Sequence, residues 1–204
     1  MITRLGSWLV LLLVFSGLGA GAPGEAGRVA WPNPAVVRQA VQEGERIWRA
    51  VASDPIRDVA SRDLFTYALA LGEGAVHPER LERLLAVATR MQQRDPASRG
   101  YGNFRWSWSH ADVFDFNAVD FCLQAGTILW LRHRDTMSPT ARDLLRTLLE
   151  FGAEGLVKHR VNESYTNIAL MNAGNLLLLG EALDRPEIAA EGGARLDRIA
   201  LYMA

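Results

Sequence analysis

The 204-residue sequence contains one cysteine, Cys122, so no intramolecular disulfide can hold the fold together. Cys122 lies in the apolar segment DFCLQAG, which favours a small buried side chain over a reactive nucleophile. Hydrophobic residues make up 49% of the chain, which is enough to build a core without covalent cross-links. The fold must therefore be held by packing.

The chain also has no excess of positive or negative charge, since 22 basic residues are balanced by 23 acidic ones. The formal net charge is -1, and nucleic-acid binding, which needs a concentrated basic surface, is not expected. Among the 22 basic residues only Lys158 is a lysine, for which a base-composition bias of the gene accounts better than anion recognition. Zinc-ligand spacings, phosphate-binding glycine loops and nucleophile elbows are absent, so we expect no metal and no cofactor.

The N-terminus has the features of a removable export signal. Arg4 precedes an apolar run at 8–18, and the small residues at 20–22 form a cleavage pattern. Pro23 directly follows that pattern, so cleavage after Ala26 is a competing choice. The apolar run is shorter than the ~20 residues that a membrane span needs.

These features predict a signal peptide at 1–22, a linker at 23–32 and an exported domain at 33–204. The mature protein is expected in the periplasm or outside the cell, without a stable membrane span.

Long runs of alternating polar and apolar residues are missing, so strands are not expected and the predicted class is all-α. Proline and glycine divide 33–204 into about seven helical segments. The expected segments begin at Asn33-Pro34, run from about 56 to 71, begin at His77-Pro78, run from about 115 to 134, begin at Ser138-Pro139, cover 164–183 and begin at Arg185-Pro186.

The later segments alternate between two kinds. The third, fifth and seventh carry charged residues on one face, as solvent-facing helices do, whereas the fourth and sixth are nearly apolar all round. Inner and outer helices in alternation predict stacked αα-hairpins. Because no strict repeat is visible, a ring is favoured over a regular solenoid, and seven helices would form an incomplete (α/α) toroid.

Polar residues nevertheless occur on the two inner segments. Buried amides are costly without partners, so these residues indicate either a water-filled central cavity or hydrogen bonds between helices, rather than a solvated face. The fourth segment carries Asn117, Asp120, Gln124 and Thr127 on one stripe, and the sixth carries Asn172 and Asn175 near the face of Tyr165.

A loop precedes each inner helix: SRGYGNFRWSWSHADVFDFN and HRVNESYTN. If the inner helices are parallel, both loops lie at one end of the stack and form a cleft of aromatic and polar groups. Phe104, Phe114 and Phe116 are expected to plug the core instead. The predicted binding residues are Asn103, Arg105, Trp106, Trp108, Asp112, Asn117, Asn162, Glu163 and Asn167, and His110 and Tyr165 are the candidate catalytic pair.

With GNFRW ahead of one inner helix and SYTNIALMNAGNLLLLGEAL forming the other, residues 60–204 resemble the α/α-toroid domain of polysaccharide lyases of the chondroitin/alginate and heparinase types. The resemblance implies an acidic polysaccharide as partner and β-elimination as the reaction. It also implies that Asn103 neutralises the uronate carboxylate, although Phe104 and Arg105 replace the aromatic pair expected after it. A Tyr, often with a His, would transfer the proton.

Such toroids contain more hairpins than this chain supplies, so we expect a truncated or incomplete ring whose uncovered helical edge promotes self-association. Two other functions stay open. One is a glycoside hydrolase that uses Asp112 or Asp115 with Glu163. The other is a non-catalytic helical module that binds glycan or protein.

Overall fold

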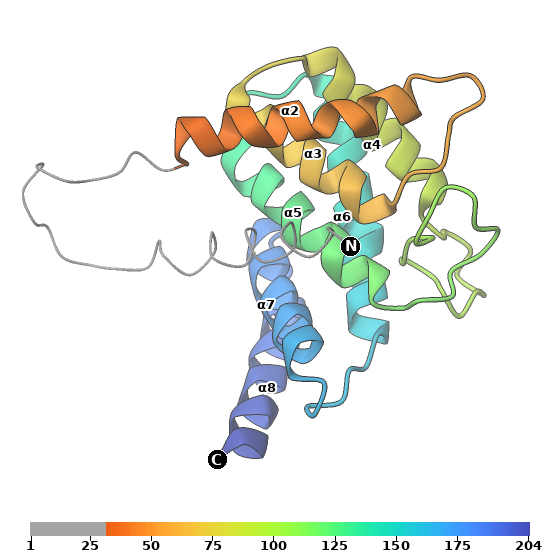
Figure 1. Ribbon diagram of the computed structural model, residues 1–204. Coiled ribbons are helices and arrows are strands. Elements are labelled where there is room, and N and C mark those ends of the chain that lie inside the picture. Colours follow the sequence, from red (N-terminus) through yellow and green to blue (C-terminus); the bar gives the residue numbers. More distant parts are fainter. Residues whose placement is uncertain (1–31) are drawn as a thin grey trace, which may run out of the picture.

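The computed structural model describes residues 32–204, and within them it contains α-helices and no strand (Figure 1). The predicted all-α class and its seven segments are confirmed over this range. The predicted signal peptide lies outside the described residues. The helices are α2 (Pro34–Val51), α3 (Ser61–Gly74), α4 (Pro78–Met91), α5 (Ala118–His133), α6 (Pro139–Lys158), α7 (Thr166–Ala182) and α8 (Pro186–Met203).

Local capping sets several of the helix boundaries. The side chain of Asn33 accepts a hydrogen bond from the Ala35 amide, and Ser138 accepts one from the Ala141 amide. Both helices then begin with proline, which has no amide hydrogen to leave unpaired. His77 occupies the N-cap position of α4, but its side chain makes no capping bond and lies 3.6 Å from the carboxylate of Glu79 instead.

The helices form three stacked hairpins in two layers. One layer consists of α3, α5 and α7, and the other of α4, α6 and α8. Each hairpin joins one helix of each layer, and α2 packs on the first hairpin (Figure 1). The predicted stack is therefore confirmed, whereas its curvature into a toroid stays a prediction.

The two layers differ in burial as predicted. Ten of the 16 residues of α5 and nine of the 17 residues of α7 are buried, against four of the 18 residues of α8. Cys122 lies in the α5 core and is fully buried, and this burial raises the pKa of its thiol. The prediction that Cys122 is a packing residue is confirmed.

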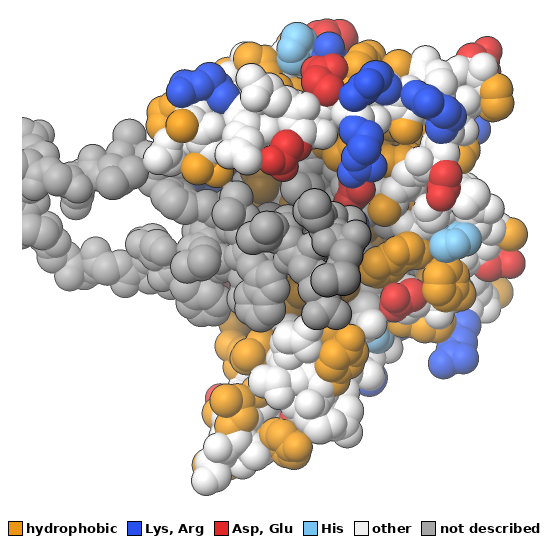
Figure 2. All heavy atoms as spheres, viewed as in Figure 1, with side chains coloured by type: hydrophobic (Ala, Val, Ile, Leu, Met, Phe, Trp, Pro, Cys, Tyr) orange, Lys and Arg blue, Asp and Glu red, His pale blue; other side chains and the backbone are white. Residues whose placement is uncertain are grey.

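The last hairpin has an apolar surface. Leu170 on α7 and three residues near the end of α8 are exposed, among them Leu201 at 78%. Figure 2 shows hydrophobic side chains along this projecting hairpin. Self-association through this edge stays a prediction. Within residues 32–204, no helix combines the length and apolar character needed to cross a membrane.

Candidate functional site

The connection between α4 and α5 is long, and backbone hydrogen bonds fasten it to the first hairpin. It pairs with the end of α4 and with the segment ahead of α3, so its aromatic residues lie against the helical core. The bonds run from Gln93 N to Asn103 O (2.8 Å), Arg105 N to Met91 O (2.9 Å), Ser61 N to Trp106 O (3.0 Å) and Trp108 N to Val59 O (2.9 Å).

Two glycines bring this connection against the end of α6. Gly102 has a φ of 79°, a left-handed conformation that favours glycine. A Cβ atom on Gly102 would lie 2.2 Å from the carbonyl oxygen of Phe151 and 2.5 Å from the amide nitrogen of Gly155. A Cβ atom on Gly155 would in turn lie 2.7 Å from the carbonyl carbon of Gly102. The absence of side chains at both positions therefore permits backbone contact.

A pocket of about 360 Å³ lies where these segments meet. It is lined by residues 99–103 and Phe116 of the α4–α5 connection and by the last turn and C-terminal flank of α6. The lining residues are Arg99, Tyr101, Asn103, Phe116, Gly155, Lys158, His159 and Arg160. The volume is within the usual range of small-molecule sites, roughly 300–1,000 Å³.

Positive side chains surround the pocket. The Lys158 ammonium lies 4.4 Å from the ring centroid of Tyr101, and the Arg99 guanidinium lies 4.9 Å from that of Phe116. Such cation–π contacts position a cation without occupying its N–H donors. Arg160 instead pairs with Glu191 on α8. Within the described chain, the lining includes no carboxylate, so the pocket is suited to an anionic ligand.

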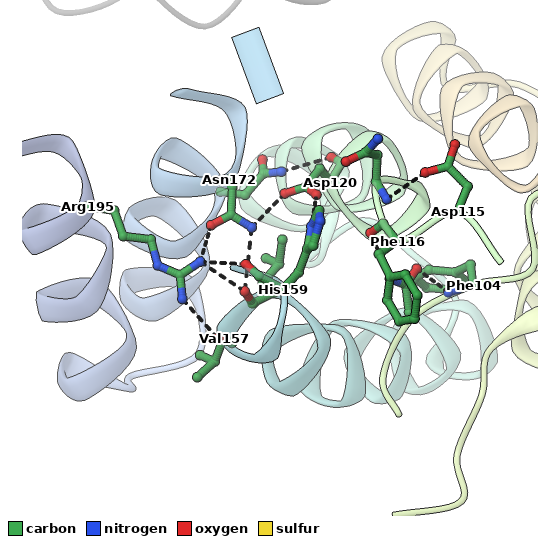
Figure 3. A network of polar contacts seen from close by, with 12 residues as sticks. Phe104, Asp115, Phe116, Asp120, Val157, His159, Asn172 and Arg195 are labelled. Atoms are coloured by element: carbon green, nitrogen blue, oxygen red, sulfur yellow. Dashed lines mark hydrogen bonds and ion pairs between the residues drawn. The ribbon is translucent and has the colours of Figure 1, made fainter. Parts of the chain in front are cut away.

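A buried polar network holds His159 at the pocket wall (Figure 3). Its Nδ1 lies 2.7 Å from Oδ2 of Asp120, a fully buried carboxylate on α5. Asn172 on α7 donates to Oδ1 of the same carboxylate at 2.8 Å. Burial raises the pKa of Asp120, and the hydrogen bond from His159 is the largest opposing effect.

The buried amides of the inner helices therefore form hydrogen bonds between helices. Asn172 binds the Asp120 side chain, and Asn175 donates to the Asp120 backbone carbonyl at 2.8 Å. Of the two predicted explanations for these polar residues, interhelical bonding is the one observed at Asp120. Thr127 on the same stripe is buried, and its hydroxyl has no partner among the described residues.

Asn103 is the one predicted site residue that lines the pocket. It is buried, and its side chain joins the two ends of the connection. Its Nδ2 donates to the carbonyl of Phe116 at 2.8 Å, and its Oδ1 accepts from the Phe104 amide at 2.7 Å. Asn103 thus contributes to the shape of the pocket.

The predicted aromatic and basic residues of the connection lie outside the pocket lining. Trp106 packs edge-on against Phe121 of α5, and Trp108 lies beneath the guanidinium of Arg90. Arg105 donates to the carbonyls of Trp108 and His110, so its guanidinium fastens the loop.

The phenylalanines of the connection take three different positions. Phe104 is fully buried and packs edge-on against Phe65, which confirms it as a core plug. Phe114 is 62% exposed and Phe116 lines the pocket, so the plug prediction is wrong for these two residues.

The other predicted residues are also outside the pocket lining. In the α6–α7 connection, Asn162 accepts hydrogen bonds within a turn, Glu163 pairs with Arg198, and Tyr165 is exposed. Asn167 lies in the first turn of α7 and is exposed as well. The remaining two lie in the α4–α5 connection, where Asp112 is exposed and Asn117 precedes α5.

Apart from Asn103 and Phe116, the residues that line the pocket were not singled out from the sequence. The run Lys158-His159-Arg160 places three basic residues at the end of a helix, and this run was the available signal. By its position alone, a histidine at the end of a helix is explained by the favourable interaction of its charge with the helix dipole. The pairing of His159 with Asp120 has no local sequence signal, because 39 residues separate the two.

The chemistry available at the pocket is anion binding and proton transfer. Positive groups and aromatic rings surround the space, and one imidazole, held by a carboxylate, faces it. Residues 32–204 contain no cluster of three or more His, Cys, Asp and Glu side chains able to hold a metal ion. In comparisons with known proteins, no protein-family model, no curated protein and no solved structure matches this chain.

Proposed function

We propose that this protein is an exported carbohydrate-active protein that binds an acidic polysaccharide in the pocket between the α4–α5 connection and the end of α6. The observation that carries the proposal is the cationic lining, in which Arg99, Lys158 and Arg160 surround one concave space. Guanidinium and ammonium groups bind carboxylates and sulfates by charge-assisted hydrogen bonds. The rings of Tyr101 and Phe116 add apolar surface on which a sugar can pack.

We further propose a lyase-like reaction for this site, on the strength of the resemblance to the lyase toroids. In β-elimination a base removes the C5 proton of a uronate, a C4–C5 double bond forms, and the C4–O bond breaks with protonation of the leaving oxygen. His159 is the imidazole at the pocket wall and the group suited to the proton transfer. Neighbouring cations would stabilise the negative charge that develops on the carboxylate.

The pocket favours this chemistry over glycoside hydrolysis. Hydrolysis uses two carboxyl groups on either side of the scissile bond. In the described part of the chain, Asp112, Asp115 and Glu163 are absent from the pocket lining. A non-catalytic glycan-binding module is the second candidate, because the cations and rings would serve binding equally well.

Calorimetric titration with an oligouronate and with a neutral oligosaccharide of the same length tests the binding. The double substitution of Arg99→Gln and Lys158→Gln should lower oligouronate affinity by about tenfold or more, because two charged donors are lost. Ultraviolet absorbance of the products separates the reactions, since elimination creates a conjugated double bond and hydrolysis creates none.

Arg146→Gln is the matched control. Arg146 also lies on α6 but is exposed, pairs with Glu150, and is absent from the pocket lining. Its substitution should leave oligouronate affinity unchanged. Equal binding of the neutral oligosaccharide, or equal affinity of the double variant and the control, would contradict the proposal. Binding without an absorbing product would support the non-catalytic module.

Export and self-association belong to the same proposal. Residues 1–22 supply the signal pattern, and mass spectrometry of the secreted protein should find cleavage after residue 22 or 26. The exposed side chains of Leu170 and Leu201 supply the apolar edge. Light scattering should show oligomers that dissociate when both are replaced by Gln, and a monodisperse monomer would exclude this part.

A further inference from the structure

The hydrogen bonds around Asp120 and Arg195 form a closed ring that binds His159 through both its side chain and its backbone carbonyl. The side chain of His159 is bound to Asp120, Asp120 is bound to Asn172, and Asn172 accepts from the guanidinium of Arg195. The same guanidinium donates to the backbone carbonyl of His159 at 2.9 Å. Four helical elements, from α5 to α8, thus contribute to the placement of one imidazole (Figure 3).

Arg195 also caps the C-terminus of α6 from outside that helix. The last carbonyls of an α-helix have no partner within it and carry partial negative charge. Arg195 donates to the carbonyl of Leu156 at 3.2 Å and to that of Val157 at 2.9 Å, and its side chain is 7% exposed. This cap fixes the backbone from which Lys158, His159 and Arg160 enter the pocket.

The donor and acceptor atoms of this ring of hydrogen bonds can be assigned from its partners. A guanidinium only donates, so the oxygen of the Asn172 amide must face Arg195 and its nitrogen must face Asp120. Oδ1 of Asp120 accepts from Asn172, and with the carboxylate ionised Oδ2 accepts as well, so that Nδ1 of His159 then carries the proton between them. In a neutral imidazole, Nε2 is then the unprotonated nitrogen. No described residue forms a hydrogen bond with Nε2, and the ring lines the pocket.

We propose that Asn172 and Arg195 are positioning residues that act on the pocket from outside it, by fixing His159 with Nδ1 protonated and Nε2 free to accept a proton from a bound ligand. The proposal rests on the proposed function in one respect, that the ligand is an acidic sugar. Neither Asn172 nor Arg195 is among the residues that line the pocket.

Nitrogen NMR of histidine-labelled mature protein measures the tautomer directly, because protonated and unprotonated ring nitrogens have well-separated shifts. The His159→Gln variant assigns the His159 signals among the four histidines of the chain. In the neutral imidazole of the wild-type protein we expect His159 to be protonated at Nδ1 and unprotonated at Nε2. A His159 protonated at Nε2 and not at Nδ1 in the wild-type protein would overturn the proposal.

Asn172→Leu breaks the ring, and Asn175→Leu is the matched control. Both asparagines are buried on α7 and bind Asp120, but Asn175 binds its backbone carbonyl and forms no hydrogen bond with its carboxylate or with Arg195. Asn172→Leu should give a mixture of His159 tautomers and lower oligouronate affinity by about tenfold. Asn175→Leu should lose stability but keep the wild-type His159 spectrum.

Arg195→Lys provides a second variant if Asn172→Leu fails to fold. A lysine keeps the positive charge but lacks the planar fork that binds three carbonyls and an amide together. It should also mix the tautomers. Unchanged His159 spectra in a folded Asn172→Leu or Arg195→Lys protein would overturn the proposal. If the spectra change as expected and no oligouronate binds, the positioning role stands and the proposed function fails.

Discussion

Replacement of Gly102 by alanine should lower both the stability of the protein and the ligand affinity of the pocket. The φ of 79° at Gly102 is a left-handed conformation, which costs a residue with a side chain about 1–2 kcal/mol. The added Cβ of Gly102→Ala would also lie 2.2 Å from the carbonyl oxygen of Phe151 and 2.5 Å from the amide nitrogen of Gly155. Both are backbone atoms of α6 and cannot rotate away.

Relief of this overlap requires the connection to move off α6, and overpacking of this kind costs about 1–3 kcal/mol. The two effects together predict that Gly102→Ala lowers the free energy of unfolding by about 2–5 kcal/mol. At roughly 2–4 °C per kcal/mol, the melting temperature should fall by about 4–20 °C. The displaced connection carries Tyr101 and Asn103, so oligouronate affinity should fall as well.

Gly174→Ala is the control, because a Cβ atom there meets no atom within 4 Å and the residue lies inside α7. Alanine is the better helix former, so this variant should gain about 0.5–1 kcal/mol. Urea denaturation of both variants gives the two free energies. The reasoning is refuted if Gly102→Ala lies within about 0.5 kcal/mol of the wild-type protein or if both variants shift in the same direction.

Three further predictions concern the loop and the core. The Ser109 amide and the Ser107 hydroxyl lower the pKa of Asp58, so the stabilisation by this carboxylate is present above its ordinary pKa of about 3.9 and is lost as pH falls through the lowered value. Asp58→Ala should therefore be less stable than wild-type at pH 7 in urea denaturation, and a difference that persists at pH 2 would contradict this assignment. Trp106→Ala should lower the melting temperature without changing oligouronate affinity, because the ring packs on Phe121 outside the pocket lining; a selective loss of affinity would return Trp106 to the binding site. The buried thiol of Cys122 should react with a thiol reagent only after unfolding, and rapid labelling of the folded protein would contradict its burial.

Much of the fold could be predicted from the sequence because helix signals are local. The helix starts predicted at Asn33-Pro34 and Ser138-Pro139 are observed, and the side chains of Asn33 and Ser138 accept from amides two and three residues later. The start of α5 was misplaced by three residues. There, the side chain of Asp115 accepts from the Asn117 amide and holds a turn that helical periodicity does not reveal.

The site could be predicted less completely, because some residues of the α4–α5 connection pack the loop onto the first hairpin and others line the pocket. Arg105 and Trp106 have the chemistry of a binding site, yet the structure uses them to fasten the loop to the first hairpin. Tyr101 and Arg99 at the start of the loop face the pocket instead. Sequence pattern gives the composition of an irregular loop but not the direction of its side chains, since a loop has no fixed period.

The helices, the alternation of exposed and buried helices, and the need for polar partners inside the stack could all be predicted from local sequence patterns. These follow from the spacing of apolar residues, proline and capping groups within a few turns of chain. The contact of Asp120 with His159 and the cap of Arg195 on α6, by contrast, depend on how whole helices pack and could not be predicted from the sequence. The decisive contacts, such as that of Gly102 with Gly155, join distant segments whose distance depends on the packing of whole helices.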